Sequence, residues 1–148
     1  MQNPLYVERL YPSKGLIAAY LLSFPMVLLA AAPFGWTLAL VLASVVTASI
    51  ITISIVVAPL VVVDDVRLMA GRIAIPREVL KDPVVVRGET LRLELGPNLN
   101  ALAQRVIKGE VKSAIKIPVD DSADPTPYLL ISTRRPEELR SALLANRA

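Results

Sequence analysis

Three aspartates, Asp120, Asp121 and Asp124, lie close together in a stretch that also contains Pro125 and Pro127. Carboxylate oxygens are the ligands that Mg²⁺ and Ca²⁺ prefer, so these residues are candidate metal ligands for a metal-dependent enzyme. Their spacing lacks the alternation and the central glycine of a calcium-binding loop. Aspartate and proline are also typical of turns, in which aspartate side chains accept hydrogen bonds from nearby backbone amides. The sequence favours a turn here and predicts no metal site and no cofactor.

Two adjacent arginines, Arg134 and Arg135, directly precede a predicted helix that begins at Pro136. Guanidinium groups beside a helix N-terminus attract anions, so the pair is a candidate binding site for an anion or a lipid headgroup. The alternative is a solvated basic pair that faces an anionic membrane surface, and this alternative is favoured. The arginines are therefore candidates for binding rather than for catalysis.

A nucleophile paired with a base is the other arrangement that could do chemistry. Ser113 and Lys116 resemble such a pair, but the strand expected at residues 114–119 sends side chains at an odd offset to opposite faces. The chain contains no His and no Cys, which excludes Ser-His-Asp triads, thiol catalysis, zinc fingers and disulfide scaffolds. Its glycines form no phosphate-binding loop. The sequence thus predicts a protein that is not an enzyme.

Lysines recur every four residues at Lys108, Lys112 and Lys116. On a helix they would form one basic stripe, but Gly109 and the β-branched neighbours favour a strand or a loop. The net charge is only +3, and Tyr128 is the only aromatic residue in the C-terminal half of the sequence. Proteins that bind nucleic acid need a basic surface and, for single strands, aromatic platforms for the bases. Nucleic acid is therefore not an expected partner.

The segments that carry these residues differ in polarity. No charged residue occurs between Lys14 and Asp64, a run of 49 residues in a chain of 148. One helix needs about 20 apolar residues to cross the hydrocarbon core of a membrane, so the run fits two spans, at about 16–32 and 36–57. Pro25 lies inside the first span and predicts a kink there.

A buried hairpin in a soluble protein and a cleaved signal peptide are the alternatives to two membrane spans. The first is disfavoured because buried helices of soluble proteins still carry some charges, and the second because another apolar span follows at once. Ala39, Ala43 and Thr47 share one stripe of the second span and offer a face of small side chains for helix packing. Neither span contains Asp, Glu, Lys, Arg or His, which argues against a proton relay, a voltage sensor or an ion-coupled transporter.

Basic residues flank the uncharged run at both of its ends. Arg9 and Lys14 precede the first span, whereas the short loop between the spans has no basic residue. The basic residues that follow the second span are Arg67, Arg72, Arg77 and Lys81. The positive-inside rule places these flanks in the cytoplasm. We therefore expect a multi-pass protein of the cytoplasmic (inner) membrane with both termini in the cytoplasm.

Residues 64–148 consist of short β-branched segments separated by glycine and proline. The expected strands are residues 66–70, 72–76, 84–86, 114–119 and 128–132. Residues 90–95 alternate as a strand does but have the composition of a helix, so both readings stay open. A helix is expected at 136–146, where Leu139 and Leu143 belong to one apolar stripe.

Two domains follow from these patterns. Residues 1–63 hold an N-terminal segment and a two-helix transmembrane hairpin, and residues 64–148 form a cytoplasmic β-rich domain with a C-terminal helix. The expected fold class is a membrane α-helical hairpin plus a small α+β domain. Its strands are expected to form a bent β-sheet or partial barrel, closed by the C-terminal helix, with a pleckstrin-homology-like order of elements.

The stretch DSADPTPYLLISTRRPEEL at residues 121–139 resembles the signature of an actinobacterial two-span membrane family, domain-of-unknown-function family 3093. Shorter similar stretches are YVERL at 6–10, GRIAIP at 71–76 and GPNLN at 96–100. The resemblance covers most of the chain and implies two membrane spans with a cytoplasmic domain. It implies no activity and no catalytic residue.

A non-catalytic accessory or scaffold subunit of a larger membrane protein complex is the preferred hypothesis, because no catalytic arrangement and no intramembrane charge is found. The expected partners are other membrane proteins, as subunits of a multi-subunit complex, and the lipid bilayer. One alternative is a membrane-anchored lipid- or peptide-binding sensor that uses Arg134 and Arg135. The other is a metal-dependent enzyme centred on the three aspartates.

Overall fold

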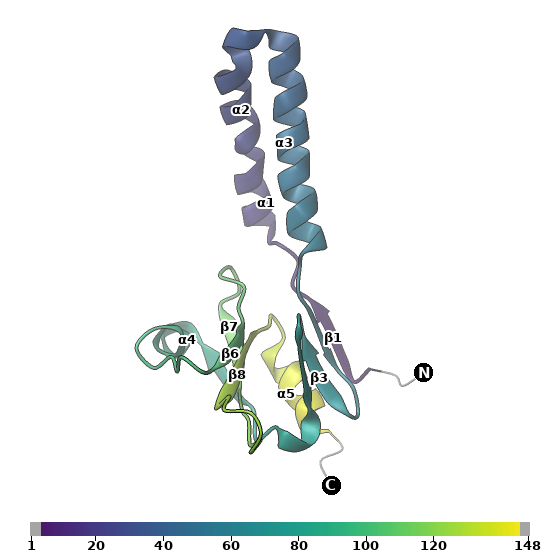
Figure 1. The fold of residues 1–148 in the computed structure, drawn as a ribbon, viewed down its shortest axis with the longest axis vertical. Coiled ribbons are helices and arrows are strands. Elements are labelled where there is room, and N and C mark those ends of the chain that lie inside the picture. The colour runs from purple at the N-terminus through teal and green to yellow at the C-terminus, as the bar shows by residue number, and fades with distance from the viewer. Residues whose placement is uncertain (1–3, 146–148) are drawn as a thin grey trace. The chain divides into compact units, whose positions relative to one another are not determined.

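A computed structural model describes residues 4–145 of the chain (Figure 1). The chain divides into two compact units. Residues 11–58 form the helical unit, and residues up to Leu10 together with those from Pro59 onward form the sheet unit. This division differs from the predicted boundary after residue 63, because the segments that precede and follow the helices pair with each other as strands.

The helical unit is an antiparallel pair of apolar helical stretches. Its elements are α1 (Lys14–Leu21), α2 (Ser23–Ala31), the 3₁₀ helix η1 (Ala32–Phe34) and α3 (Trp36–Val56). Gly35 turns the chain with φ 116°, a conformation that favours glycine. Two stretches of 21 residues each, Lys14–Phe34 and Trp36–Val56, are long and apolar enough to cross a membrane by length and composition. They coincide with the two predicted spans.

The first of these stretches is interrupted at Leu22, three residues before Pro25. Proline has no N–H to donate to the carbonyl four residues earlier, here that of Leu21, and its ring crowds that carbonyl. The Ser23 hydroxyl donates to the Tyr20 carbonyl at 2.7 Å and so satisfies part of the opened ladder. The irregularity predicted from Pro25 therefore takes the form of a break between α1 and α2.

Small side chains line the contact between α2 and α3. Ala39, Ala43 and Thr47 are the buried residues of α3, and the hydroxyls of Ser23 and Thr47 share a hydrogen bond of 2.9 Å between the helices. The predicted stripe of small residues thus packs within the hairpin itself. The large apolar side chains of α3 lie on its other sides and are exposed.

The first sheet of the sheet unit has four antiparallel strands in the order β1-β2-β3-β4. These strands are β1 (Tyr6–Arg9), β2 (Leu60–Val63), β3 (Arg67–Ala70) and β4 (Ile73–Pro76). Strands β3 and β4 match two predicted strands, with the turn at Gly71 (φ 60°). Strands β1 and β2 are not predicted, because β2 continues the uncharged run and the partner of β1 lies beyond the hairpin.

The second sheet has the order β5-β7-β8-β6, in which only the pair β6 and β8 is parallel. Its strands are β5 (Val84–Arg87), β6 (Gln104–Val106), β7 (Ser113–Pro118) and β8 (Tyr128–Ser132), with the 3₁₀ helix η2 (Arg77–Val79) before β5. The predicted single bent sheet or partial barrel is corrected to two sheets. The physical reason is that β1 and β2 complete a first sheet with β3 and β4.

Residues 90–95 belong to helix α4 (Gly88–Leu95), which covers one face of the second sheet. Leu91 and Leu95 are four residues apart and therefore share the helix face that packs on this sheet. Strand β8 is buried along its whole length, because α4 lies on one side of it and the main core on the other.

The main core lies between the two sheets and helix α5 (Pro136–Leu144). Its fully buried side chains include Val61, Val63, Leu68, Ile115, Ile117, Leu129, Ile131, Leu139 and Leu143. Figure 1 shows α5 in yellow, and α5 contacts β1 and β2 of the first sheet and β5 and β7 of the second. The predicted C-terminal helix and its apolar stripe are confirmed, although residue 146, its predicted end, lies outside the described residues.

Candidate functional site

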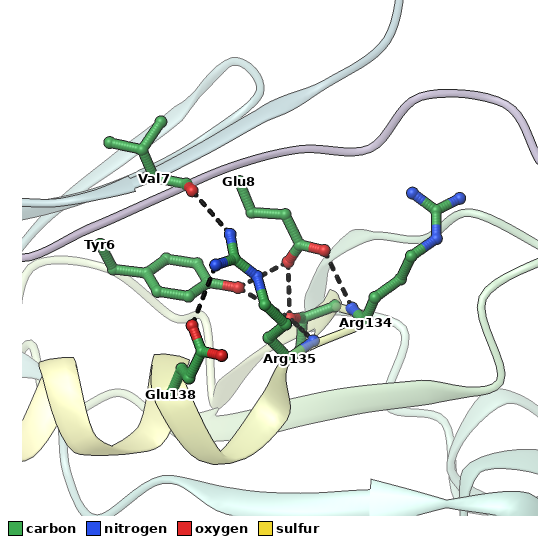
Figure 2. A network of polar contacts seen from close by, with 7 residues as sticks. Tyr6, Val7, Glu8, Arg134, Arg135 and Glu138 are labelled. Carbon is green, nitrogen blue, oxygen red and sulfur yellow. Dashed lines mark hydrogen bonds and ion pairs between the residues drawn. The ribbon is translucent and has the colours of Figure 1, made fainter.

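A carboxylate is buried where β1 meets the end of β8. The Glu8 side chain is only 6% exposed and accepts hydrogen bonds from the hydroxyls of Tyr6 and Thr133, both at 2.6 Å. The backbone N–H of Arg134 donates to the other carboxylate oxygen at 3.0 Å. Figure 2 shows these bonds meeting at Glu8. The buried charge is thus stabilised by protein donors in place of water.

Arg135 is held against β1 by internal partners. Its guanidinium donates to the Val7 carbonyl at 2.9 Å and pairs with Glu138 at 2.9 Å. The same group lies 5.1 Å from the centre of the Tyr6 ring, within the range of a cation–π contact. The backbone N–H of Arg135 donates to the Thr133 hydroxyl at 3.0 Å. Arg135 therefore joins the start of α5 to the first strand of the chain (Figure 2).

The two arginines that are candidates for anion binding have different surroundings. Arg135 is engaged as described, whereas the side chain of Arg134 extends away from that guanidinium (Figure 2). The carboxylates found here, Glu8 and Glu138, belong to the chain itself. The hydrogen bonds of the cluster join β1 to the segment that follows β8 and to the start of α5. Binding of an external anion or lipid headgroup by Arg134 and Arg135 stays a prediction.

The Tyr6 hydroxyl is kept protonated by its surroundings. Burial, followed by the hydrogen bond that it donates to Glu8, raises the pKa of Tyr6 from 10.0 to about 12. The hydroxyl is therefore a permanent donor to Glu8 at neutral pH. Tyr6 and Glu8 are two residues apart on a strand and share one face, but the sequence does not indicate that this face is buried, because β1 itself is not predicted.

A second buried charge, Arg77, holds the C-terminal end of α5. Its guanidinium donates to the carbonyls of Ala142 and Leu143, both at 3.0 Å. It also donates to the Asp64 carbonyl at 3.0 Å and to the Ala145 carbonyl. The last carbonyls of a helix lack partners within the helix and carry partial negative charge, so a cation there is favourable. In the sequence Arg77 looks like one more basic residue after the second span.

The three clustered aspartates have protein partners of two kinds, backbone and side-chain donors in local turns and a lysine. Asp121 accepts from the backbone N–H two residues later at 2.9 Å. Asp124 accepts from the N–H and the hydroxyl of Thr126 at 2.9 and 2.6 Å, and these bonds lower the pKa of Asp124. Asp120 pairs with Lys81 at 2.7 Å. Among residues 4–145, no group of three or more Asp, Glu, His or Cys could hold a metal ion. The turn bonds expected of these aspartates are present at Asp121 and Asp124.

Ser113 and Lys116 bind different partners, as their odd offset on a strand predicts. The Ser113 hydroxyl donates to the Thr133 carbonyl at 2.6 Å. The Lys116 ammonium pairs with Glu94 of α4 at 2.6 Å and lies 4.3 Å from the centre of the Tyr128 ring. Lys116 therefore fastens α4 to the second sheet instead of serving as a base for Ser113.

A cavity of about 460 Å³ lies between α4 and the loop at residues 107–112. Its apolar lining residues are Leu91, Leu95, Ile107 and Val111, and its charged ones are Glu89, Arg92, Lys108 and Lys112. The evenly spaced lysines are thus divided, because Lys108 and Lys112 lie in this loop and Lys116 lies in β7. No sequence pattern predicts the cavity, since its two walls come from segments that are more than ten residues apart.

Comparisons with known proteins complete the description of these sites. No curated protein matches the chain, and no solved structure matches it. The pleckstrin-homology-like order of elements stays a prediction. A family model described as "Protein of unknown function (DUF3093)" matches residues 5–143, which include both helical stretches and both sheets. The resemblance noted in the stretch at residues 121–139 is thereby confirmed, and the chain belongs to the DUF3093 family of proteins of unknown function.

Proposed function

We propose that the protein is an integral protein of the cytoplasmic membrane and a non-catalytic accessory or scaffold subunit of a larger membrane protein complex. The surface of the helical unit carries this proposal, since Met26, Leu29 and Trp36 are 71%, 70% and 66% exposed. Large apolar side chains on a surface are unfavourable in water but favourable in lipid or against another apolar helix. The uncharged run between Lys14 and Asp64 supports the same environment.

Both ends of the chain are proposed to lie in the cytoplasm. Arg9 precedes the first helical stretch, Lys14 is its first residue, and several basic residues follow the second stretch, whereas the turn at residues 32–36 has none. Basic residues near the ends of membrane spans are retained on the cytoplasmic side. Under this orientation the sheet unit is cytoplasmic, because both of its segments adjoin the helices on the basic side.

A binding role, as opposed to a catalytic one, is supported by the partners of the hydroxyl, ammonium and carboxylate groups that could do chemistry. The Ser113 hydroxyl is bound to a backbone carbonyl, Lys116 to a carboxylate, and Asp124 to Thr126. These groups maintain the fold of the sheet unit. A subunit whose polar residues secure its own fold and whose helices expose apolar surface is suited to holding other components in place.

A partner helix is proposed to pack on the outward side of α3. Val41, Val45 and Ala48 are exposed and lie on the side of the helix opposite the buried stripe that contains Ala39 and Ala43, because successive residues are about 100° apart. The small side chain of Ala48 permits close approach of another helix on this side.

Cysteine labelling tests the orientation, because the chain has no native Cys to interfere. Thr37→Cys places a thiol at the turn between the helices, and Ser122→Cys places one in an exposed turn of the sheet unit. In intact cells, a membrane-impermeant maleimide should label Thr37→Cys, whereas Ser122→Cys should react only after lysis. Labelling of both variants or of neither in intact cells, or the reverse pattern, contradicts the proposed orientation.

Gentle extraction from native membranes tests the subunit role. We expect stoichiometric membrane proteins to be recovered with the chain in a particle larger than its monomer. Ala48→Trp places a large side chain on the outward side of α3 and should release these partners. Ile53→Trp is the matched control, since Ile53 is also exposed but lies about 140° around α3 from Ala48, away from the proposed partner side. Recovery of the monomer alone, under conditions that preserve other complexes, argues against the subunit role.

A further inference from the structure

The cavity beside α4 combines apolar walls with positive charge. Its volume of about 460 Å³ falls within the range of roughly 300–1,000 Å³ that is typical of small-molecule sites. All of its lining residues belong to the sheet unit. An inference from the cavity therefore goes beyond the proposed subunit role and does not depend on it.

The apolar wall of the cavity continues a hydrophobic cluster of the sheet unit. Leu91 is buried in the cluster between α4 and the second sheet, and Leu95 and Ile107 pack against this cluster while being only partly buried. Val111, from the main core, supplies the rest of the wall. These side chains present apolar surface that a ligand can cover, and covering such surface is favourable in proportion to its area.

The wall is held in place by bonds that leave the cavity itself open. The backbone N–H of Gly88 donates to the Lys112 carbonyl at 3.4 Å, which joins the start of α4 to the end of the loop. The N–H of Lys108 donates to the Ser132 hydroxyl at 3.0 Å, which ties the start of the loop to β8. The cavity is thus framed by ordered segments at both ends of the loop.

Positive charge predominates around the opening. Arg92, Lys108 and Lys112 line the cavity together with a single acid, Glu89, whose carboxylate is 3.6 Å from Arg92. Within residues 4–145, neither Lys108 nor Lys112 forms an ion pair with a carboxylate. The two ammonium groups thus flank an apolar cavity outside any ion pair among the described residues, unlike Lys116, which is paired with Glu94. Among the nearby acids, Glu89 lies beside Arg92, and Glu110 lies between the two lysines in the loop.

We propose that this cavity binds a single-chain anionic amphiphile, an alkyl or acyl chain that ends in a phosphate or carboxylate. The chain lies against Leu91, Leu95 and Ile107, and the anionic end lies between Lys108 and Lys112. An apolar wall beside unpaired cations complements this ligand in both parts. A nucleotide fits less well, because no aromatic residue lines the cavity to stack on a base.

Gly109 provides a way to fill the cavity without disturbing its walls. A Cβ placed on Gly109 meets no atom within 4 Å, and its backbone does not have the positive φ that Gly88 has. Gly109→Leu therefore puts a side chain into open space beside Lys108 and should leave the fold intact. Gly88 is unsuitable for the same purpose, because its φ of 53° makes a side chain there strained.

Photo-crosslinking of the full-length protein tests the proposal in nanodiscs of phosphatidylcholine. The probe is decyl phosphate with a diazirine at the end of its chain, and decyl trimethylammonium with the same diazirine is the cationic control. We expect the phosphate probe to label residues 88–95 and 107–112, and the cationic probe not to. Gly109→Leu should abolish this labelling while the thermal unfolding of the protein stays unchanged.

The charge requirement is tested separately from the shape of the cavity. Lys108→Gln with Lys112→Gln should reduce labelling about tenfold, since each lost charge-assisted contact lowers the affinity by a factor of about three. Arg72→Gln with Arg140→Gln removes two exposed charges elsewhere and should have no effect. Lysophosphatidic acid with a diazirine in its single acyl chain forms the second arm, which distinguishes a lipid-derived amphiphile from a free alkyl phosphate as the source.

Labelling of the cavity by either anionic probe supports the proposal and identifies the source. The proposal is overturned if neither probe labels residues 88–95 and 107–112, or if the cationic probe labels them equally well. Labelling that persists in Gly109→Leu, or that falls equally in the Arg72 and Arg140 control, also overturns it. Because the two sets of variants act on shape and on charge, misfolding of one leaves the other to decide.

Discussion

The two units of the chain place large and small side chains in opposite positions. In the helical unit Ala39, Ala43 and Thr47 are buried, and large residues such as Met26 are exposed. In the sheet unit large residues such as Leu129 fill the core, and charged residues cover the surface. This opposite placement is the one expected if the helical unit lies in lipid, as proposed, and the sheet unit in water. Small residues let helices approach closely when lipid removes the hydrophobic drive for burial.

Polar groups differ between the units in the same way. In the helical unit, a hydrogen bond between the hydroxyls of Ser23 and Thr47 joins α2 to α3. The sheet unit buries a carboxylate, Glu8, and a guanidinium, Arg77, each surrounded by hydrogen-bond partners. A buried charge is tolerated only when its partners replace water.

Glu8→Ala is expected to have the largest effect. The change leaves the hydroxyls of Tyr6 and Thr133 and the Arg134 N–H without their acceptor, and we expect a loss of about 3 kcal/mol in the stability of the sheet unit. Amide hydrogen exchange in β1 and β8 measures this loss. Glu8→Gln keeps one oxygen acceptor and should lose about half as much. Unchanged exchange in Glu8→Ala would mean that the buried network does not hold β1 in place.

Arg77→Met is expected to destabilise the sheet unit by about 2 kcal/mol, because the last carbonyls of α5 lose a charged donor. Hydrogen exchange should rise first at the end of α5. The control is Arg72→Met, which removes an exposed arginine five residues earlier and should change exchange little. Equal effects of the two variants would show that the position of the charge at the helix end is unimportant.

Thr47→Val is expected to cost only about 0.6 kcal/mol, the average for a hydrogen bond between membrane helices. Val keeps the shape of Thr and removes only the hydroxyl that bonds to Ser23. The chain has one Trp, Trp36, so its fluorescence during unfolding in dodecyl sulfate follows the helical unit alone. A loss as large as that of Glu8→Ala would erase the contrast between the two units.

Lowering the pH is expected to have the smallest effect, and only on the sheet unit. Hydrogen bonds from Thr126 lower the pKa of Asp124 below its ordinary 3.8 in the folded protein. This contribution to stability is present above pH 3.8 and disappears as the pH falls through the lowered folded-state pKa. Asp124→Asn should remove this part of the pH dependence in thermal unfolding, whereas Trp36 fluorescence should report no change in the helical unit. A pH dependence identical in both proteins contradicts the assignment.

The sequence was informative where one property repeats along a segment. The uncharged run predicted both helical stretches, and the alternation around Ile73 and the apolar stripe of residues 136–146 predicted β4 and α5. It was uninformative where a residue depends on a distant partner. Strands β1 and β2 are four residues each and pair across the hairpin, so neither has a local pattern that distinguishes it.

The candidate site residues also differ in whether their partners are local or distant in the sequence. Asp121 and Asp124 form local turn bonds, which their composition predicts. Arg135 reads as an exposed cation in the sequence, yet its partners Val7 and Glu138 include one that is more than a hundred residues away. Lys108 and Lys112 read as part of a regular basic series, and only the packing of α4 opens a cavity between them and Leu91.

The order of residues specifies the kind of surroundings that each segment tolerates, because burial of charge and exposure of apolar surface to water are costly wherever the segment lies. It thereby determined the helical pair, its break near Pro25 and the family. Which charged side chains are buried or paired, and which groups are their partners, depends on the packing of distant segments. Glu8, Arg77 and Lys116 differ little from other charged residues along the chain, but the pairing of β1 with β2 and the docking of α4 and α5 surround each with specific partners. Such partners come from distant segments, so only the completed fold brings them together.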